Sequence, residues 1–453
     1  MKNEHNGKHF AAALPWAALA LAALTWLMSL AYGFQYLVSG NVARHLTYFR
    51  IATVPYAALV MVLTWFAVRR APLPAAFGRG AAWLGLAMVS ASWVLTCYFF
   101  SSELAPAPWP AVALILPAAG FIAIRQGGPD AGTWVWLASL LALCLFLIPR
   151  TPHDAAGDML QIIDFASADL LRGVSPFQPY LTSSGKEVPF GYWPGVWLPY
   201  LPLVALGIDL RVLNLVAFGL IVLLFVRAAG GWNGSGTILA LTLFPFMASS
   251  QMLQMFLFGH LWVYWLCVCL TLYFVVQRRY ALAALLLGIC LVTRPTVLFI
   301  VAPLAAWVWS RAGLAVLLRS VAIALAVVLA VQLPFVLAYG EAYIANSFGR
   351  LVGFGQVLTH FSLAGMLRAA GLQALNLPLQ ALIAVALFAL VAMRRSLPAA
   401  QFVMVCGLAY VWEVLFASYA TRYVYFPGFL LLILGLVIAQ RDGAAARSRA
   451  ADA

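Results

Sequence analysis

Charged residues are scarce in this chain. They make up 9% of its 453 residues and only 13 are Asp or Glu, whereas 65% of the residues are hydrophobic and the mean hydropathy is +0.98. A soluble domain needs far more polar surface, so the composition excludes one. Uncharged runs of about 17 to 25 residues recur along the chain, and each is long enough to cross roughly 30 Å of hydrocarbon as a helix. The predicted fold class is therefore an all-α polytopic membrane protein.

Several motifs that carry other functions are missing as well. The sequence has no Gly-rich phosphate loop, no Rossmann pattern and no long cytoplasmic segment, so ATP or a nucleotide-sugar is not expected as a direct substrate. All six cysteines lie inside apolar segments without a metal-binding spacing to His, so we expect neither disulfides nor zinc. The net charge of +13 comes from basic residues scattered singly between spans, which indicates membrane topology and no nucleic-acid partner.

The apolar runs predict about 14 transmembrane helices. We place them at residues 10–32, 51–68, 81–100, 108–124, 131–149, 210–226, 236–250, 258–277, 280–293, 296–310, 320–338, 376–393, 398–417 and 423–440. The apolar stretch 192–206 is short and carries three prolines, so we expect it to form a re-entrant or interfacial helix.

An even number of crossings puts both termini in the cytoplasm, and the composition suggests the inner (plasma) membrane of a bacterium. In this topology all three arginine doublets face the cytoplasm, in accord with the positive-inside bias. The doublets are Arg69 and Arg70, Arg278 and Arg279, and Arg394 and Arg395. Ten basic residues face outward and each needs a reason: Arg44, Arg50, Arg150, Arg172, Lys186, Arg211, Arg294, Arg350, Arg368 and Arg422.

Arg294 and Arg422 are the most unusual of these cations. Each lies between two apolar runs without a carboxylate beside it in the sequence. An unpaired cation near the membrane core is costly, so each either binds an anion or extends to the lipid headgroups. Both interpretations stay open at this point.

Two segments outside the membrane, 150–191 and 339–375, are both predicted to face outward. The first holds four of the 13 carboxylates: Asp154, Asp158, Asp164 and Asp169. Its pattern predicts an amphipathic helix along the membrane surface, with Asp158 as the N-cap and an end at Arg172-Gly173. Asp169 is expected to pair with Arg172, and Asp164 and Asp169 to form the helix's wet face. Asp154 and Asp158 lie where the chain leaves a span, near His153, and are the candidate reactive carboxylates.

The order of several motifs resembles the multi-pass GT-C glycosyltransferases, in particular their bacterial mannosyltransferase-like branch. The motifs are GVSPF, YWPGVWLPY, FLFGHLWVY, LVTRPT, FSLAGMLRAAGL and TRYVYFP, and the resemblance covers residues 150–440. It divides the chain into extra helices of unknown role at 1–130 and a GT-C-like catalytic domain at 131–453. The chain departs from the family in having five predicted spans before the loop, Ile162 where a Tyr is common, and Gly259-His260 in place of Gly-Gln.

The resemblance implies transfer of a sugar from a polyprenyl-phosphate donor to the hydroxyl of a lipid or glycan acceptor on the periplasmic side, with inversion. Asp158 would be the general base, with Asp154 second. Cations would hold the lipid phosphate, since a leaving anion needs them. The implied donor-binding residues are Arg294, Arg422, His260, Tyr192 and His153. No cofactor is implied, although Asp154 and Asp158 together would also suit a divalent cation.

Two other classes compete with this interpretation. An O-antigen ligase or polymerase would use Arg and His of the late outer segment, which here are Arg350, His360 and Arg368. A lipid or glycolipid transporter would show charges along a midplane path and two related halves, and the sequence has no convincing internal repeat.

Overall fold

The computed structural model describes most of the chain after residue 108. The described residues are 109–151, 159–183, 185–231, 250–347, 362–394, 396–417 and 422–451, with isolated positions between 57 and 97 and at 239 and 243. Three predicted site residues, His153, Asp154 and Asp158, lie outside the described residues, as do Arg350 and His360.

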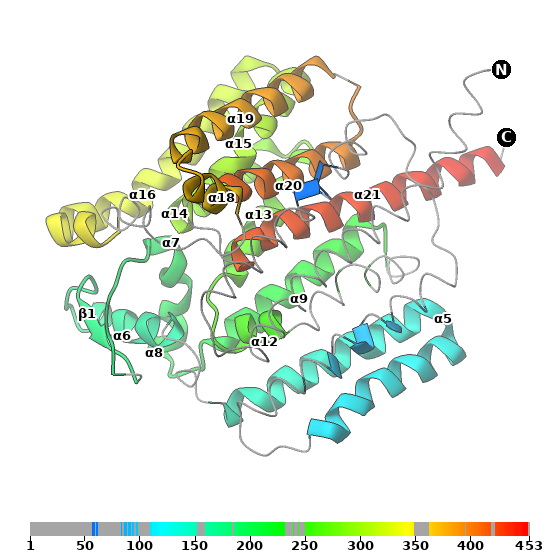
Figure 1. The fold of residues 1–453 in the computed structure, drawn as a ribbon, viewed down its shortest axis with the longest axis horizontal. Coiled ribbons are helices and arrows are strands. Elements are labelled where there is room, and N and C mark those ends of the chain that lie inside the picture. The colour runs from blue at the N-terminus through cyan, green and yellow to red at the C-terminus, as the bar shows by residue number, and fades with distance from the viewer. Residues whose placement is uncertain are drawn as a thin grey trace.

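Long apolar helices dominate the described residues (Figure 1). They are α5 (Trp109–Leu147), α9 (Arg211–Ala228), α13 (Trp262–Val276), α14 (Tyr280–Thr293), α15 (Val301–Ala312), α16 (Leu314–Ser347), α19 (Asn376–Met393), α20 (Ala399–Phe416) and α21 (Phe426–Ala451). Among the described residues, six helical stretches are long and apolar enough to cross a membrane. The all-α membrane class is therefore confirmed, and the total of 14 spans stays a prediction. Apart from residue 108, which lies outside the described residues, the predicted spans 108–124 and 131–149 fall on α5 and on the 3₁₀ turn η1 (Ile148–Arg150) that follows it.

Two helices at the centre of the bundle pack through glycines. A Cβ on Gly407 of α20 would lie 2.8 Å from the carbonyl oxygen of Gly428 in α21, so only glycine permits this approach. In the most apolar stretches of α20 and α21, 83% and 78% of the residues are buried inside the protein. The corresponding shares are 6% in α16 and 11% in the stretch that contains α19. The helices α20 and α21 thus form the core, and α16 and α19 present apolar side chains to lipid.

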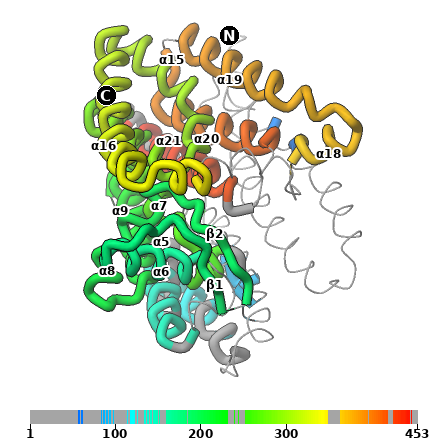
Figure 2. Tube along the Cα trace, turned by 90° about the vertical axis from the view of Figure 1, so that its left-hand side faces the viewer, coloured from blue at the N-terminus to red at the C-terminus, as the bar shows by residue number. Residues whose placement is uncertain are grey.

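A small unit, here called the cap, covers one end of this bundle (Figures 1 and 2). It consists of α6 (Met159–Leu171), the antiparallel strands β1 (Pro179–Leu181) and β2 (Glu187–Pro189), α7 (Pro194–Trp197), the 3₁₀ turn η2 (Leu198–Tyr200) and α8 (Leu201–Ala205). The predicted stretch 192–206 thus forms three short helical turns, and none is long enough to cross the membrane.

The helix predicted in the first outer segment exists, but Asp169, which was expected on its solvent-exposed face, is buried. Gln161 and Asp169 are each 8% exposed. They are buried because the hairpin folds over α6: the Ser183 amide donates to Oε1 of Gln161 over 3.1 Å, and Gln178 and Tyr180 donate to Asp169. The helix therefore forms the inside of the cap and does not lie with this face in water.

The second outer segment begins close to where it was predicted, because the long apolar part of α16 ends at a break at Gly340, where φ is 42°. A short helical stretch then continues to Ser347. Its last turns pack on the cap: the rings of Phe177 and Tyr343 are 4.8 Å apart, and Nε1 of Trp193 donates to the carbonyl of Ser347 over 3.2 Å. The first residues of 339–375 and the segment 150–191 therefore lie against each other (Figure 2). Helix α18 (Leu363–Ala369) and the turn η5 (Gln373–Leu375) follow.

Candidate functional site

Arg211, the first residue of α9, binds the chain just before residues 152–158, here called the acidic segment. The Arg211 side chain is buried, pairs with Asp209 and donates to the carbonyl oxygens of Ile148, over 2.7 Å, and of Thr151. Thr151 is followed by the residues that include Asp154 and Asp158, and α6 begins at Met159. Both residues that flank this acidic segment, Thr151 and Met159, thus lie at the cap end of the bundle.

One turn later in α9, Asn214 connects the cap to the chain around Gly259. Its Nδ2 donates to the carbonyl oxygens of Phe256, over 3.1 Å, and of Gly259, over 2.9 Å, while its Oδ1 accepts from Tyr200 of the cap over 2.8 Å. The helix expected at 258–277 begins at Trp262, four residues later than predicted. Helix α12 (Ser250–Leu257) ends before Gly259, where a Cβ would lie 2.6 Å from a backbone oxygen.

Three of the predicted donor-binding residues come together beside this connection. The rings of Tyr192 and His260 are 4.7 Å apart, and Arg294 lies near enough to His260 for its charge to act on the imidazole. His260 is 5% exposed, and its Nδ1 has no hydrogen-bond partner among the described residues. A buried, unsatisfied imidazole nitrogen beside a cation favours a site that takes a polar ligand.

The backbone around Arg294 is set by the cap. A Cβ on Gly195 of α7 would lie 2.5 Å from Oγ1 of Thr293, so α7 rests directly on the last turn of α14. Arg294 follows in an extended conformation, with φ −153° and ψ 125°, before the 3₁₀ helix η3 (Pro295–Ile300). The glycine of YWPGVW therefore brings the segment of Tyr192 against the segment of Arg294.

Three hydroxyl groups from separate elements meet next to Arg294. The Tyr410 hydroxyl donates to Oγ1 of Thr296 over 2.8 Å, and the Tyr264 hydroxyl lies 3.0 Å from the same oxygen and 3.4 Å from the Tyr410 hydroxyl. The charge of Arg294 also acts on Tyr410. This hydroxyl cluster joins α13, η3 and α20 and adds polar groups at the cap end of a mainly apolar bundle.

Arg422 begins the turn η6 (Arg422–Tyr425), between α20 and α21, and its side chain lies outside the described residues. The turn lies beside the first turns of α13, because the ring of Phe426, which directly follows η6, is 5.2 Å from the ring of Trp265. The backbone of Arg422 therefore lies at the cap end too.

Several polar residues of this region were missed by the sequence reasoning. They are Asn214, Tyr264, Thr296, Tyr410 and Glu413. Glu413 lies one turn from Tyr410 in α20, is 5% exposed, and its carboxyl group has no hydrogen bond or ion pair within the described part of the chain. Most of them are single polar residues in apolar runs, so the available signal was the cost of a polar group inside a span.

Asp169 is a structural residue of the cap. It pairs with Arg172, as expected, and accepts from Nε2 of Gln178 over 2.6 Å and from the Tyr180 hydroxyl over 2.9 Å. Burial alone would raise the pKa of Asp169, but these hydrogen bonds and the charge of Arg172 together lower it. Its expected place on a wet face is therefore wrong, because the carboxylate joins α6 to the hairpin.

No cluster of three or more His, Cys, Asp or Glu suited to a metal ion occurs among the residues that the structure describes. Asp154 and Asp158 fall outside them, so the possible cation site of these two carboxylates stays a prediction. No family model, curated protein or solved structure matches the chain.

Proposed function

We propose that the protein is a membrane glycosyltransferase of the GT-C type, which moves a sugar from a polyprenyl-phosphate donor to an acceptor hydroxyl at the cap side of the membrane. The observation that supports this best is the set of polar groups gathered at one end of an apolar bundle. Arg294, His260 and the hydroxyl cluster lie there, and so do Thr151 and Met159, which flank the acidic segment in the sequence.

The chemistry of such a transfer matches these groups. The bond between the sugar and the donor phosphate breaks, and the phosphate leaves with the electron pair. A cation beside it stabilises this charge most where water is scarce, which suits Arg294, and Arg422 is the second candidate. His260 and Tyr192 supply a ring surface and a ring nitrogen for the sugar or the phosphate.

The acceptor hydroxyl must lose a proton as the new bond forms. We assign this step to Asp158, which is joined directly to Met159, the first residue of α6, with Asp154 as the second candidate. The donor, a lipid or glycan acceptor and the surrounding membrane lipids are the proposed partners, and no cofactor takes part in these steps.

Transfer by purified full-length protein in lipid nanodiscs, with a short-chain polyprenyl-phosphate sugar, tests the proposal. Asp158→Asn should lower kcat on the order of 10² to 10⁴-fold, the range for loss of a general base. Arg294→Gln should lower kcat by about 10² to 10³-fold, as expected when a group that stabilises developing charge is removed.

Asp164→Asn is the matched control, since Asp164 is a carboxylate of the neighbouring helix without an assigned catalytic part, and it should retain activity. Undiminished transfer by Asp158→Asn would exclude Asp158 as the base and make Asp154→Asn the next variant. Absence of transfer by the wild type with every lipid-phosphate sugar would refute the proposal.

A further inference from the structure

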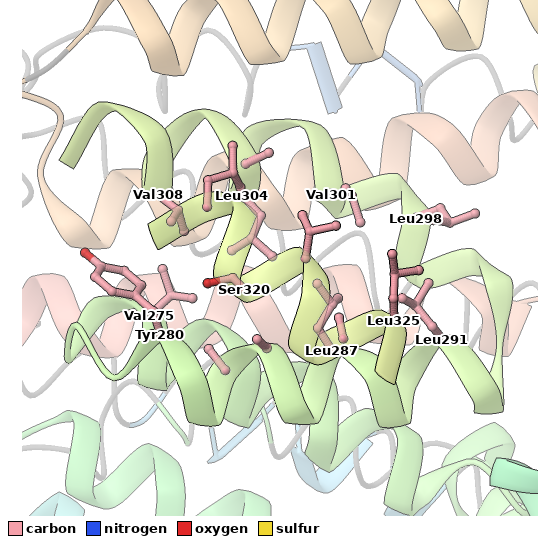
Figure 3. A pocket seen from close by; sticks show the side chains of 16 residues that line it. Val275, Tyr280, Leu287, Leu291, Leu298, Val301, Leu304, Val308, Ser320 and Leu325 are labelled. Carbon is pink, nitrogen blue, oxygen red and sulfur yellow. The ribbon is translucent and has the colours of Figure 1, made fainter. Parts of the chain in front are cut away.

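An apolar groove runs between α14, α15 and α16 (Figure 3). Its volume is about 160 Å³, and among its lining residues only Tyr280 and Ser320 carry a polar side-chain atom. The Ser320 hydroxyl donates to the carbonyl of Val316, so its hydrogen is used inside α16. The groove therefore has the surface chemistry of a hydrocarbon site.

The groove opens towards lipid. Three of its lining residues, Leu298, Val321 and Leu325, are 55%, 45% and 52% exposed, and α16 is the least buried of the candidate spans. Along α14 the lining extends from Tyr280 to Leu291, which at 1.5 Å per residue is about 16 Å. That is close to half of the roughly 30 Å hydrocarbon thickness, so the groove has the length of one acyl chain in one leaflet.

Two arginines stand at the Tyr280 end of the groove. Arg278 and Arg279 form the turn between α13 and α14 and are exposed. The Arg279 amide donates to the carbonyl of Phe274 over 2.8 Å and the Arg278 amide to that of Val275 over 3.0 Å, which is the hydrogen-bond pattern of a Schellman motif. In the described residues neither arginine forms an ion pair.

Arg278 occupies the position of this motif where glycine is favoured. Its φ is 59°, and it is the only residue other than glycine with a positive φ among those described. A side chain at this angle costs backbone strain, so the fold alone would favour glycine. An arginine at this position therefore points to a role for its side chain outside the turn.

We propose that the groove and the two arginines form a binding site for an acidic glycerophospholipid of the leaflet on the Arg278 side. One acyl chain lies in the groove between α14, α15 and α16, and the phosphate lies beside Arg278 and Arg279. Glycosyl transfer is not involved, because this mouth of the groove lies at the opposite end of α14 from Arg294.

Native mass spectrometry of the full-length protein in detergent, with added phosphatidylglycerol or phosphatidylcholine of identical chains, tests the headgroup part. The wild type should bind phosphatidylglycerol more tightly. Arg279→Gln should weaken that binding roughly fivefold, the effect of one basic residue near an anionic headgroup, and leave phosphatidylcholine unchanged.

Arg319→Gln is the matched control for charge. Arg319 directly precedes the lining residue Ser320, yet it is two residues, or about 200°, from Val321 and so lies on the other face of α16. This variant should bind both lipids like the wild type. Equal retention of the two lipids by the wild type, or an equal loss in Arg319→Gln and Arg279→Gln, would overturn the proposal.

Arg278→Gly separates lipid binding from folding. It should raise the unfolding temperature in neutral detergent, because the strain is relieved, and at the same time weaken phosphatidylglycerol binding roughly fivefold. Unchanged phosphatidylglycerol binding would show that the Arg278 side chain does not contact the lipid and would overturn its part in the site.

Ala305→Leu tests the groove itself, since Ala305 lines it and a larger side chain would fill it. It should weaken the binding of both lipids by a similar factor. Ala386→Leu on the exposed face of α19 is the control for added bulk and should change neither. Wild-type lipid binding by Ala305→Leu would exclude the groove as the acyl-chain site.

Discussion

The two ends of the bundle differ in how deeply their polar side chains are buried. At the cap end, Arg211 and Asn214 are 3% and 0% exposed and make defined hydrogen bonds to backbone carbonyls. At the other end, Arg278, Arg279 and Arg319 are exposed, and none of them pairs with a carboxylate of the described residues. Buried polar groups hold segments of the chain together, whereas exposed cations contact the surroundings of the protein. Removal of a buried group should therefore lower the unfolding free energy more than removal of an exposed cation.

The largest effect on stability should come from Arg211. Arg211→Leu removes the cation beside the partly exposed Asp209 and the donor to the carbonyls of Ile148 and Thr151, which should cost about 3 kcal/mol of unfolding free energy. Denaturant unfolding in detergent micelles measures this cost. The control is Arg441→Gln, which breaks a partly exposed pair with Asp442 and should cost less than about 1 kcal/mol. Similar losses in the two variants would remove the contrast between the ends.

A smaller loss is expected at Asp169 in the cap. Asp169→Asn removes a charge that accepts hydrogen bonds from Arg172, Gln178 and Tyr180, which should cost about 2 kcal/mol. Hydrogen exchange of the α6 and hairpin amides measures it, and Asp164→Asn is the control on the same helix.

The pH dependence of the cap follows from the same carboxylate. The pKa of Asp169 is lowered in the folded protein, so its contribution is present above the ordinary pKa of 3.8 and is lost as the pH falls through the lower folded value. Protection of the cap amides in the wild type should therefore drop below about pH 3.8, and Asp169→Asn should lack this drop. Equal acid sensitivity of the two proteins would contradict the assignment.

The sequence predicted the helices better than the contacts between them. Long apolar runs such as those of α9, α19 and α20 were placed to within one or two residues, because length and hydropathy alone determine whether a helix can cross. The burial of Asp169 was missed, because it depends on a hairpin that returns from nine and eleven residues away.

The candidate site shows the same limit. The cost of a cation near the membrane core was visible in the sequence and pointed to Arg294. Its neighbours Tyr264 and Tyr410 were not, because a hydroxyl in an apolar run carries no signal of the partner it meets 146 residues away. Contacts of this range come from packing, which no local pattern encodes.

The smallest effect at the cap end should come from the hydroxyl cluster. Tyr410→Phe and Tyr264→Phe should each cost about 1 kcal/mol, because Oγ1 of Thr296 keeps one tyrosine partner in either variant. The double variant removes both, so its cost should exceed the sum of the single costs. Additive costs would mean that the hydroxyls act separately. If the single variants also leave stability intact but lower glycosyl transfer, the cluster contacts the ligand and does not merely join α13 to α20.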